Sequence, residues 1–525
     1  MNNIKIYIGI LLVILLSLSS CISEFLDFSP KDQVTSAMFP QTEADAKMLL
    51  TGIYAGLRET EVYNQGMFGF GAMDGATPNA YNWGTEHVYN RLGNGTVLTS
   101  DGGIITYRWT RCYAIISRAN YLLSVIDGVE MDSNVKNLFI GETYFLRGLA
   151  YSLLVGSYGG VPIVPPSMTT DEARNVKRAS ADETWAQVIA DYDEAISKLG
   201  VNAPEPGRAS KGSALAMKMR AYLYQGKFQQ VISTADEIVA LGKYSLFPSY
   251  EGLFHADNEN NVEVIFDVQY LEGENSQGSF IDQYCGTGTG SWTRGSRYVP
   301  TNDLVNAYEN IDGSPTVLFD PNDRTTWEGR DPRLAFTVVL PHSFFLGYQF
   351  PNYLYPGGAF NHAGNPFRHL STRKYRVADE SKLPPSGQSY LNNIVIRYAD
   401  VLLSKAEALI ETGGDIPTAI ALINRIRTER NDVKITALPA TLSREEARAK
   451  VRNERRIEFA LEGLYWKDIR RWDICKQLYP QRIFDHQGNI IETRFPNGYL
   501  EQYNLLPIPD SERSMNPNLE QNPNW

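Results

Sequence analysis

The chain has 525 residues and a formal net charge of −11, which argues against a surface that binds nucleic acid or another polyanion. Hydrophobic residues make up 43% of the sequence and charged residues 21%, which excludes both a disordered chain and one with many membrane spans. Tyrosines, 30 in number, supply half of the aromatic residues, and their flat rings must fill a core or line a recognition surface.

The N-terminus has the pattern of an export signal. An uncharged apolar run from Ile6 to Leu18 is too short to cross a bilayer of about 30 Å as a permanent helix. The sequence Leu18-Ser-Ser-Cys21 resembles a bacterial lipobox, in which Cys21 is acylated and becomes the first residue of the mature protein. We therefore predict a lipoprotein signal peptide over residues 1–20 and a mature chain tethered by lipid. The alternative is a secreted protein in which this cysteine is unmodified.

Motifs for metal binding and catalysis are missing from the sequence. The six histidines form no His-Glu-x-x-His pair, no Gly-x-Ser-x-Gly motif occurs, and the glycine run at Gly286 lacks the ending of a phosphate loop. Apart from Cys21, three cysteines remain (Cys112, Cys285 and Cys475), which allows one disulfide at most. We therefore predict no metal, no cofactor and no disulfide scaffold.

Apolar residues recur with helical spacing near both ends of the chain. Two stretches, Ala216–Val239 and Tyr398–Ile426, share the helix-turn-helix spacing of tetratricopeptide units. Because such units are dispersed along the chain rather than arranged in tandem, we expect no long solenoid. The predicted helices of the first half are Thr42–Glu59, with Thr42 as N-cap, Ile104–Val125, Asn137–Val155, Ala181–Leu199, Lys211–Gln225 and Phe228–Leu241.

The middle of the chain has a different pattern. Alternating residues predict a strand over Asn261–Gln269, and a second short β run is expected over Leu334–Leu340. Loops rich in glycine and aromatic residues lie around Ser276–Pro300 and Ser343–Phe367. Functional residues are commonly found on such loops, held in place by a rigid frame.

A strongly charged segment, Ser443–Asp473, contains seven arginines interleaved with seven acidic residues. Opposite charges three and four residues apart indicate a helix stabilised by its own ion pairs, with Ile457, Leu461 and Trp466 facing inward. The pattern favours this structural role over nucleic-acid binding.

Aromatic residues also cluster in the glycine-rich segment from Tyr63 to Tyr89, and again between Phe280 and Tyr298. Aromatic faces stack on sugar rings, while Asp, Asn and Arg side chains form hydrogen bonds with sugar hydroxyls. The alternative is that these rings fill core beneath long loops. The candidate ligand-binding residues of the two clusters are Asp74, Asn79, Tyr81, Trp83, Tyr284, Trp292 and Arg294.

Ordered motifs along nearly the whole mature chain resemble those of the SusD/RagB family of nutrient-binding outer-membrane lipoproteins. They are scaffold motifs and do not identify a ligand. The motifs include Tyr54-Ala-Gly-Leu, Glu142-Thr-Tyr-Phe-Leu-Arg-Gly-Leu-Ala-Tyr, Asp331-Pro-Arg-Leu, Arg397-Tyr-Ala-Asp-Val-Leu-Leu-Ser-Lys-Ala-Glu-Ala and Glu454-Arg-Arg-Ile-Glu-Phe-Ala-Leu-Glu-Gly-Leu-Tyr-Trp.

The resemblance implies a mainly α, SusD-like fold with four tetratricopeptide-like helix pairs and a loop-rich, partly β region that carries the ligand site. It implies an N-terminal region over residues 21–260 and a C-terminal region over residues 261–525. Family ligand contacts correspond here to Asp74–Trp83, Tyr284–Arg294 and the stretch near Arg368, and Asp74 matches a recurrent acidic position of the family.

The resemblance also implies a function. Family members bind glycan fragments at the cell surface, without enzymatic activity, and pass them to a SusC-like, TonB-dependent transporter of the outer membrane. The first alternative is a peptide cargo, as in the RagB branch. The others are a surface glycoside hydrolase and a purely structural interaction module with no small-molecule site.

Overall fold

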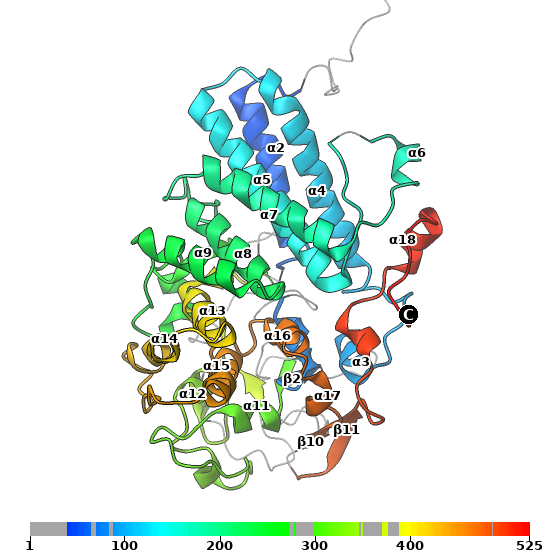
Figure 1. Cartoon of the computed structure of the whole chain (residues 1–525). Helices are drawn as coiled ribbons and strands as arrows, with labels where there is room; N and C mark the ends of the chain where they lie inside the picture. Colours follow the sequence, from blue (N-terminus) through cyan, green and yellow to red (C-terminus); the bar gives the residue numbers. More distant parts are fainter. Residues whose placement is uncertain are drawn as a thin grey trace, which may run out of the picture.

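Helices dominate the structure, which is a computed structural model, and the strands are few and short (Figure 1). The structure describes residues 39–64, 70–82, 88–166, 168–271, 278–279, 298–345, 348–349, 370–375, 388–485 and 487–525. The predicted mainly α fold class is confirmed for these residues.

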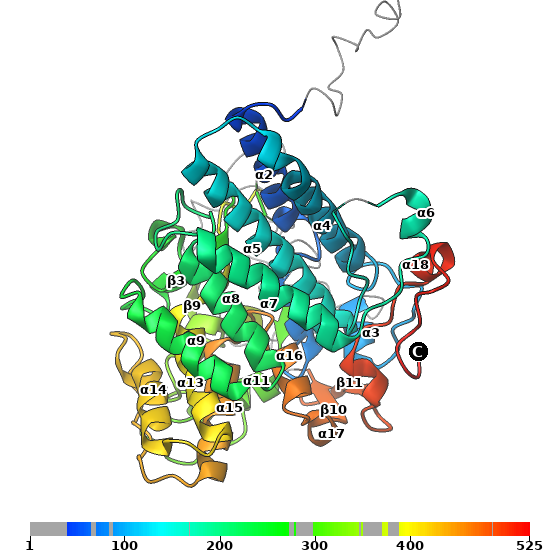
Figure 2. The same ribbon diagram turned by 45° about the horizontal axis from the view of Figure 1, so that its top comes forward.

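The longer helices lie side by side in a curved array (Figures 1 and 2). Most of them pack on the next helix of the array: α4 on α5, α5 on α7, α7 on α8, and α8 on α9. The array consists of α2 (Glu43–Ala55), α4 (Tyr107–Val125), α5 (Ser133–Tyr158), α7 (Ala181–Lys198), α8 (Lys211–Tyr224), α9 (Phe228–Ala240), α13 (Tyr398–Glu411), α14 (Ile416–Thr428) and α15 (Arg444–Glu458).

Hydroxyl side chains set where several of these helices begin. Thr42, the predicted N-cap of α2, accepts a hydrogen bond from the Asp45 N–H while the Asp45 carboxylate accepts one from the Thr42 N–H. Ser180 and Ser443 form the same reciprocal arrangement at the starts of α7 and α15. Each pair satisfies amide groups that the first turn of a helix leaves without a partner.

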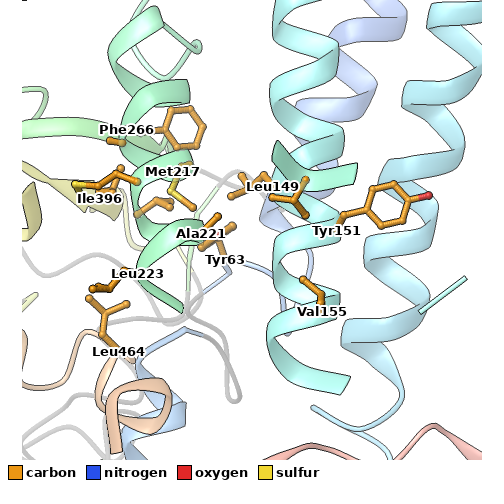
Figure 3. Close-up of a cluster of buried hydrophobic side chains, with 14 of the residues drawn as sticks. Tyr63, Leu149, Tyr151, Val155, Met217, Ala221, Leu223, Phe266, Ile396 and Leu464 are labelled. Carbon is orange, nitrogen blue, oxygen red and sulfur yellow. The ribbon is translucent and has the colours of Figure 1, made fainter. Parts of the chain in front are cut away.

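Helices that are far apart in sequence complete the array. α9 packs on α13, although residues 241–397 separate them along the chain, and α13 then packs on α14 and α15. The dispersed helix pairs are therefore adjacent in space. The largest hydrophobic core draws residues from both sides of the expected boundary at residue 260. Figure 3 shows part of this core, with side chains from α5 and α8 beside Phe266 and Ile396.

Among the described helices, α5 alone is long and apolar enough to cross a membrane by length and composition. Two-thirds (67%) of its apolar window is buried inside the protein. It packs against α2, α4 and α7, which identifies it as the central helix of the core.

Short elements surround the array, and the described strands form five small sheets, three of which join segments that are distant in sequence. The short helices are α3 (Val88–Asn94), α6 (Thr170–Ala173), α11 (Asn302–Ala307), α12 (Arg333–Thr337), α16 (Tyr465–Arg471), α17 (Cys475–Leu478) and α18 (Asp510–Met515). The strands are β1 (Ala76–Thr77), β2 (Ala80–Asn82), β3 (Val264–Val268), β4 (Tyr298–Pro300), β5 (Val338–Val339), β6 (Phe344–Phe345), β7 (Tyr348–Gln349), β8 (Ser371–Thr372), β9 (Asn393–Arg397), β10 (Gln481–Phe484) and β11 (Ile490–Arg494).

Two sequence predictions are wrong in detail. The β run expected over Leu334–Leu340 is mostly helix α12, and only Val338 and Val339 form a strand. The single helix expected over Ser443–Asp473 is two helices, α15 and α16. The chain turns between them because Leu461 and Gly463 adopt positive φ angles of 63° and 76°, which an α-helix cannot contain.

The charges of this segment also pair differently from the prediction. Glu458, the last residue of α15, accepts hydrogen bonds from Arg397 (2.6 Å), Arg430 (2.8 Å) and Arg333 (2.7 Å), and all four side chains are fully buried. Burial raises the pKa of the Glu458 carboxyl, but the three guanidinium groups outweigh it and hold the pKa well below its usual value. The three arginines that pair with Glu458 come from other elements. The charges therefore hold different elements together and do not stabilise a single helix by pairs within it.

A second buried cluster joins the array itself. Asp400 of α13 accepts hydrogen bonds from Arg455 of α15 (2.8 Å) and from Arg220 of α8 (2.9 Å). Burial raises the pKa of Asp400, and the two arginines overcome this and lower it below its usual value. Three helices are thus fixed by one carboxylate.

We predict that Glu458→Gln strongly destabilises the protein, because three buried guanidinium groups lose their common negative partner. Removing one partner of a buried ion pair costs about 3–5 kcal/mol. Denaturant unfolding of the purified variant should therefore show a clearly lower midpoint than the wild type. The matched control is Glu429→Gln, which removes an exposed pair with Arg425 and should change stability by about 0.5 kcal/mol or less. Equal midpoints for the two variants would contradict this account of the core.

Candidate functional site

A small β region lies where the aromatic-rich segments predicted to bind ligand join the described part of the chain. β1, β2 and β4 form an antiparallel sheet in which Asn82 pairs with Tyr298. The segments that continue at residues 83 and 297 therefore leave the sheet from neighbouring points. β8, which follows residue 370, packs beside β4 and pairs with β5. We call these five strands the β platform.

Asp74 stands at the base of the β platform and is fully buried. Its Oδ2 atom accepts a hydrogen bond from the Gly463 N–H (2.7 Å), and its Oδ1 atom accepts one from Asn79 Nδ2 (3.3 Å). Burial raises the pKa of the Asp74 carboxyl to about 7, although both hydrogen bonds favour the ionised form. Asp74 therefore connects the platform to the turn between α15 and α16.

Asn79 and Tyr81 are buried as well, with 0% and 1% of their surfaces exposed. Asn79 Oδ1 accepts a hydrogen bond from Arg456 Nε (2.8 Å), and its main-chain carbonyl accepts one from the Thr301 N–H (3.0 Å). Tyr81 pairs with Val299 in the sheet and belongs to a hydrophobic cluster beneath it.

This burial differs from the prediction that Asp74, Asn79 and Tyr81 offer their side chains to a ligand. Asp74 and Asn79 bond to Gly463 and Arg456 of the C-terminal half, and at most 1% of the surface of each of the three residues is exposed. Short polar side chains in a glycine-rich segment are typical of an exposed loop. Here the Asp74 and Asn79 side chains are buried and hold the Gly75–Ala80 turn in place. The three residues support the platform.

Arg494, at the end of β11, stabilises the Gly75–Ala80 turn. The sequence did not predict this role. Its guanidinium group is fully buried and donates hydrogen bonds to the carbonyl oxygens of Gly75 (2.9 Å), Thr77 (2.8 Å) and Ala80 (3.0 Å). One rigid fork of donors thus satisfies three carbonyls of a turn that has few internal bonds. No periodic or motif signal distinguishes this arginine in the sequence.

Lys374, next to β8, connects the β platform to the turn between α15 and α16. Its Nζ atom donates to the carbonyls of Glu458 and Ala460 (both 3.1 Å) and to Glu462 Oε1 (2.6 Å). Burial lowers the pKa of this ammonium group to about 8, and the neighbouring carboxylates partly oppose the shift. The buried charges around Glu458 and the platform are therefore one continuous structure.

The other predicted site residues lie outside the residues that the structure describes: Trp83, Tyr284, Trp292, Arg294, Arg368 and the lipidation residue Cys21. Within the described residues, no group of three or more His, Cys, Asp or Glu side chains is placed to hold a metal ion. Cys112 and Cys475 are both buried free thiols.

The family model described as the SusD family matches residues 262–525, which is half of the chain. The chain belongs to the SusD family. A second family model, described as starch-binding associating with outer membrane, matches residues 24–223.

Relatives extend over almost the whole length of this SusD-family chain. SusD-like protein P2 of Formosa agariphila is 26% identical over 97% of this chain and 98% of its own. A SusD-like protein of Bacteroides fragilis has a solved structure that matches 95% of this chain and all of that chain, with a TM-score of 0.81 and 25% identity. A SusD-like carbohydrate binding protein of the same species matches 91% of this chain and 99% of its own, with a TM-score of 0.81 and 27% identity.

We predict that Asp74→Asn changes how stability depends on pH. In the unfolded chain this carboxyl ionises near pH 4, whereas in the folded protein it keeps its proton until about pH 7. Raising the pH through this window therefore destabilises the folded wild type relative to the variant, which does not ionise, by up to about 1.4 kcal/mol per pH unit.

Melting temperatures of both proteins between pH 5 and pH 8 measure this difference. The melting temperature of the variant should rise relative to that of the wild type as the pH rises. The difference between the two melting temperatures should become constant above about pH 7. A difference between the two proteins that stays constant with pH would show that Asp74 is ionised throughout.

Proposed function

We propose that this SusD-family protein is a cell-surface lipoprotein that binds oligosaccharides and delivers them to a SusC-like, TonB-dependent transporter of the outer membrane. It acts by stacking and hydrogen bonding, without covalent chemistry. The proposal is supported by the 27% identical SusD-like carbohydrate binding protein of Bacteroides fragilis, whose chain matches this one almost completely.

The geometry that carries the proposal is the pairing of Asn82 with Tyr298. It fixes the ends of two aromatic-rich segments, one beginning at Trp83 and the other ending at Arg297, at neighbouring points of the same sheet. A third such segment rejoins the described chain at Leu370, directly before β8. Segments that are far apart in sequence therefore share one base, as a binding site built from several loops requires.

Within these segments we assign roles by side-chain chemistry. Trp83, Tyr284 and Trp292 supply rings that stack on sugar faces, and Arg294 and Arg368 supply hydrogen bonds to hydroxyl groups. Each sugar hydroxyl exchanges bonds with water for bonds with protein, so the net gain is about 1 kcal/mol or less per bond. The resulting modest affinity suits a protein that must release its cargo to a transporter.

The described chain begins at the helical end of the molecule (Figure 1). The described chain begins beside the start of α2, where Tyr121 donates a hydrogen bond to the Phe39 carbonyl (3.1 Å) and Thr42 pairs with Glu130. Figure 1 shows the start of α2 at one end of the molecule and β10 and β11 at the other. The segment that leads back to Cys21 therefore joins the described chain at the helical end.

We predict that Trp83→Ala and Trp292→Ala each weaken oligosaccharide binding at least tenfold, because each removes a stacking ring. Calorimetry or a glycan array on the chain beginning after Cys21 measures this. The matched control is Tyr121→Ala, which removes a partly exposed ring of α4 beside Phe39 and should leave binding unchanged.

The same panel separates the alternatives. Binding of peptides but not of oligosaccharides would replace the glycan cargo with a peptide cargo. Release of reducing ends during long incubation with the tightest oligosaccharide would identify a glycoside hydrolase. Wild-type binding in both tryptophan variants would refute the assigned stacking residues.

A further inference from the structure

A pocket of about 350 Å³ lies between the loop of residues 202–208, the pair Lys243 and Tyr244, and the start of β3. We propose that it is a second carbohydrate-binding site, which takes one or two sugar rings independently of the β platform. Its volume falls at the lower end of the range of about 300–1,000 Å³ found for ligand pockets. The choice of ligand class rests on the function proposed above, and the site itself rests on the geometry that follows.

The walls of the pocket are fixed without a ligand. Pro204 and Pro206 restrict the backbone of the loop, and Gly207 lies at a φ of 75°, where an added Cβ would sit 2.2 Å from Gln269 Cγ. The neighbouring Arg208 donates to the fully buried Glu142 carboxylate (2.7 Å). A preformed pocket loses little conformational freedom when a ligand enters, which favours binding.

The Asp267 carboxylate, which is 3% exposed, contributes hydrogen-bond acceptors to the pocket lining. Its Oδ1 atom accepts from Gln269 Nε2 (2.7 Å), and its Oδ2 atom accepts from Asn392 Nδ2 (3.2 Å). The carboxylate also accepts a hydrogen bond from its own N–H, and because its two oxygens have four lone pairs, one acceptor position remains. A sugar ring presents hydroxyl donors that match such a position.

The walls add a ring and unused polar groups. The Tyr244 hydroxyl lies 3.4 Å from Ser210 Oγ, longer than the usual distance of about 2.7–2.8 Å for such a bond, so it can take a better partner. The exposed Asn202 amide makes no hydrogen bond with any residue that the structure describes. The Lys243 ammonium lies over one face of the Tyr244 ring, 5.6 Å from its centre, so stacking on a sugar uses the opposite face while the amide and carboxylate groups supply hydrogen bonds.

A comparable pocket of about 320 Å³ beside α5 lacks this chemistry and provides the control. Its guanidinium group, Arg147, already donates to both oxygens of Asp191 (3.0 and 2.6 Å) and to Asn120 (2.7 Å). Two tyrosines line it: Tyr144 lies under that guanidinium group, 5.1 Å from ring centre to guanidinium carbon, and the Tyr151 hydroxyl accepts a hydrogen bond from the Val164 N–H (2.9 Å). The polar groups of this pocket already have hydrogen-bond partners within the protein.

The test uses saturation-transfer NMR with maltose, cellobiose, laminaribiose and xylobiose on the chain beginning after Cys21. We compare the wild type with the Trp83→Ala/Trp292→Ala double variant, in which the proposed platform site is removed. At least one disaccharide should still bind the double variant, and adding Tyr244→Ala or Asp267→Asn should weaken that binding at least tenfold. Adding Tyr144→Ala should leave it unchanged, and melting temperatures confirm that each variant is folded.

The outcomes separate the two proposals. If no disaccharide binds the double variant, or if Tyr244→Ala and Asp267→Asn leave binding intact, the pocket is a hydrated crevice and the inference is overturned. If the wild type and the double variant bind equally well and Tyr244→Ala removes the binding, the pocket stands and the platform proposal fails. If the double variant does not fold, calorimetry on the wild type and on Tyr244→Ala decides by the number of disaccharides bound per chain. We expect two binding sites in the wild type and one in Tyr244→Ala.

Discussion

The attraction between one buried carboxylate, Glu458, and three buried guanidinium groups is the constraint on which the site depends. Arg333, Arg397 and Arg430 come from α12, the end of β9 and the segment after α14, so a single charge fixes three segments at the end of α15. Ions buried in this way are costly unless every partner is in place. Competing arrangements that leave one arginine unpaired are therefore strongly disfavoured. The end of α15, and with it the turn that follows, is held in a single arrangement.

That turn transmits the constraint to the β platform. The Gly463 N–H of this turn donates a hydrogen bond to Asp74, and carbonyls of the same turn accept hydrogen bonds from Lys374. Arg494 donates hydrogen bonds to carbonyls of the Gly75–Ala80 turn on the platform side. The platform thus has a rigid base of charge-assisted hydrogen bonds.

The sequence predicts the helices well because their signals are local. The 3.6-residue spacing and the hydroxyl at position 42 depend only on near neighbours, and Thr42 caps α2 as expected. Long-range pairing leaves no such signal: the charges of residues 443–473 have equally good partners within the segment and outside it, so the sequence cannot show that Glu458 pairs with Arg333. For the same reason Asp74 has the pattern of a ligand contact until the fold shows Gly463 beside it, and Arg494 has no pattern at all.

The central claim is that the buried charges hold the β platform rigid before any ligand binds. Hydrogen exchange of the ligand-free chain, followed by mass spectrometry, tests it most directly. Peptides covering residues 74–82 and 298–301 should exchange as slowly as those of α13 and α15, and adding the best-bound oligosaccharide should leave their rates unchanged. Exchange of these amides within seconds, slowed only by the ligand, would contradict the claim and show that the sugar itself orders the platform.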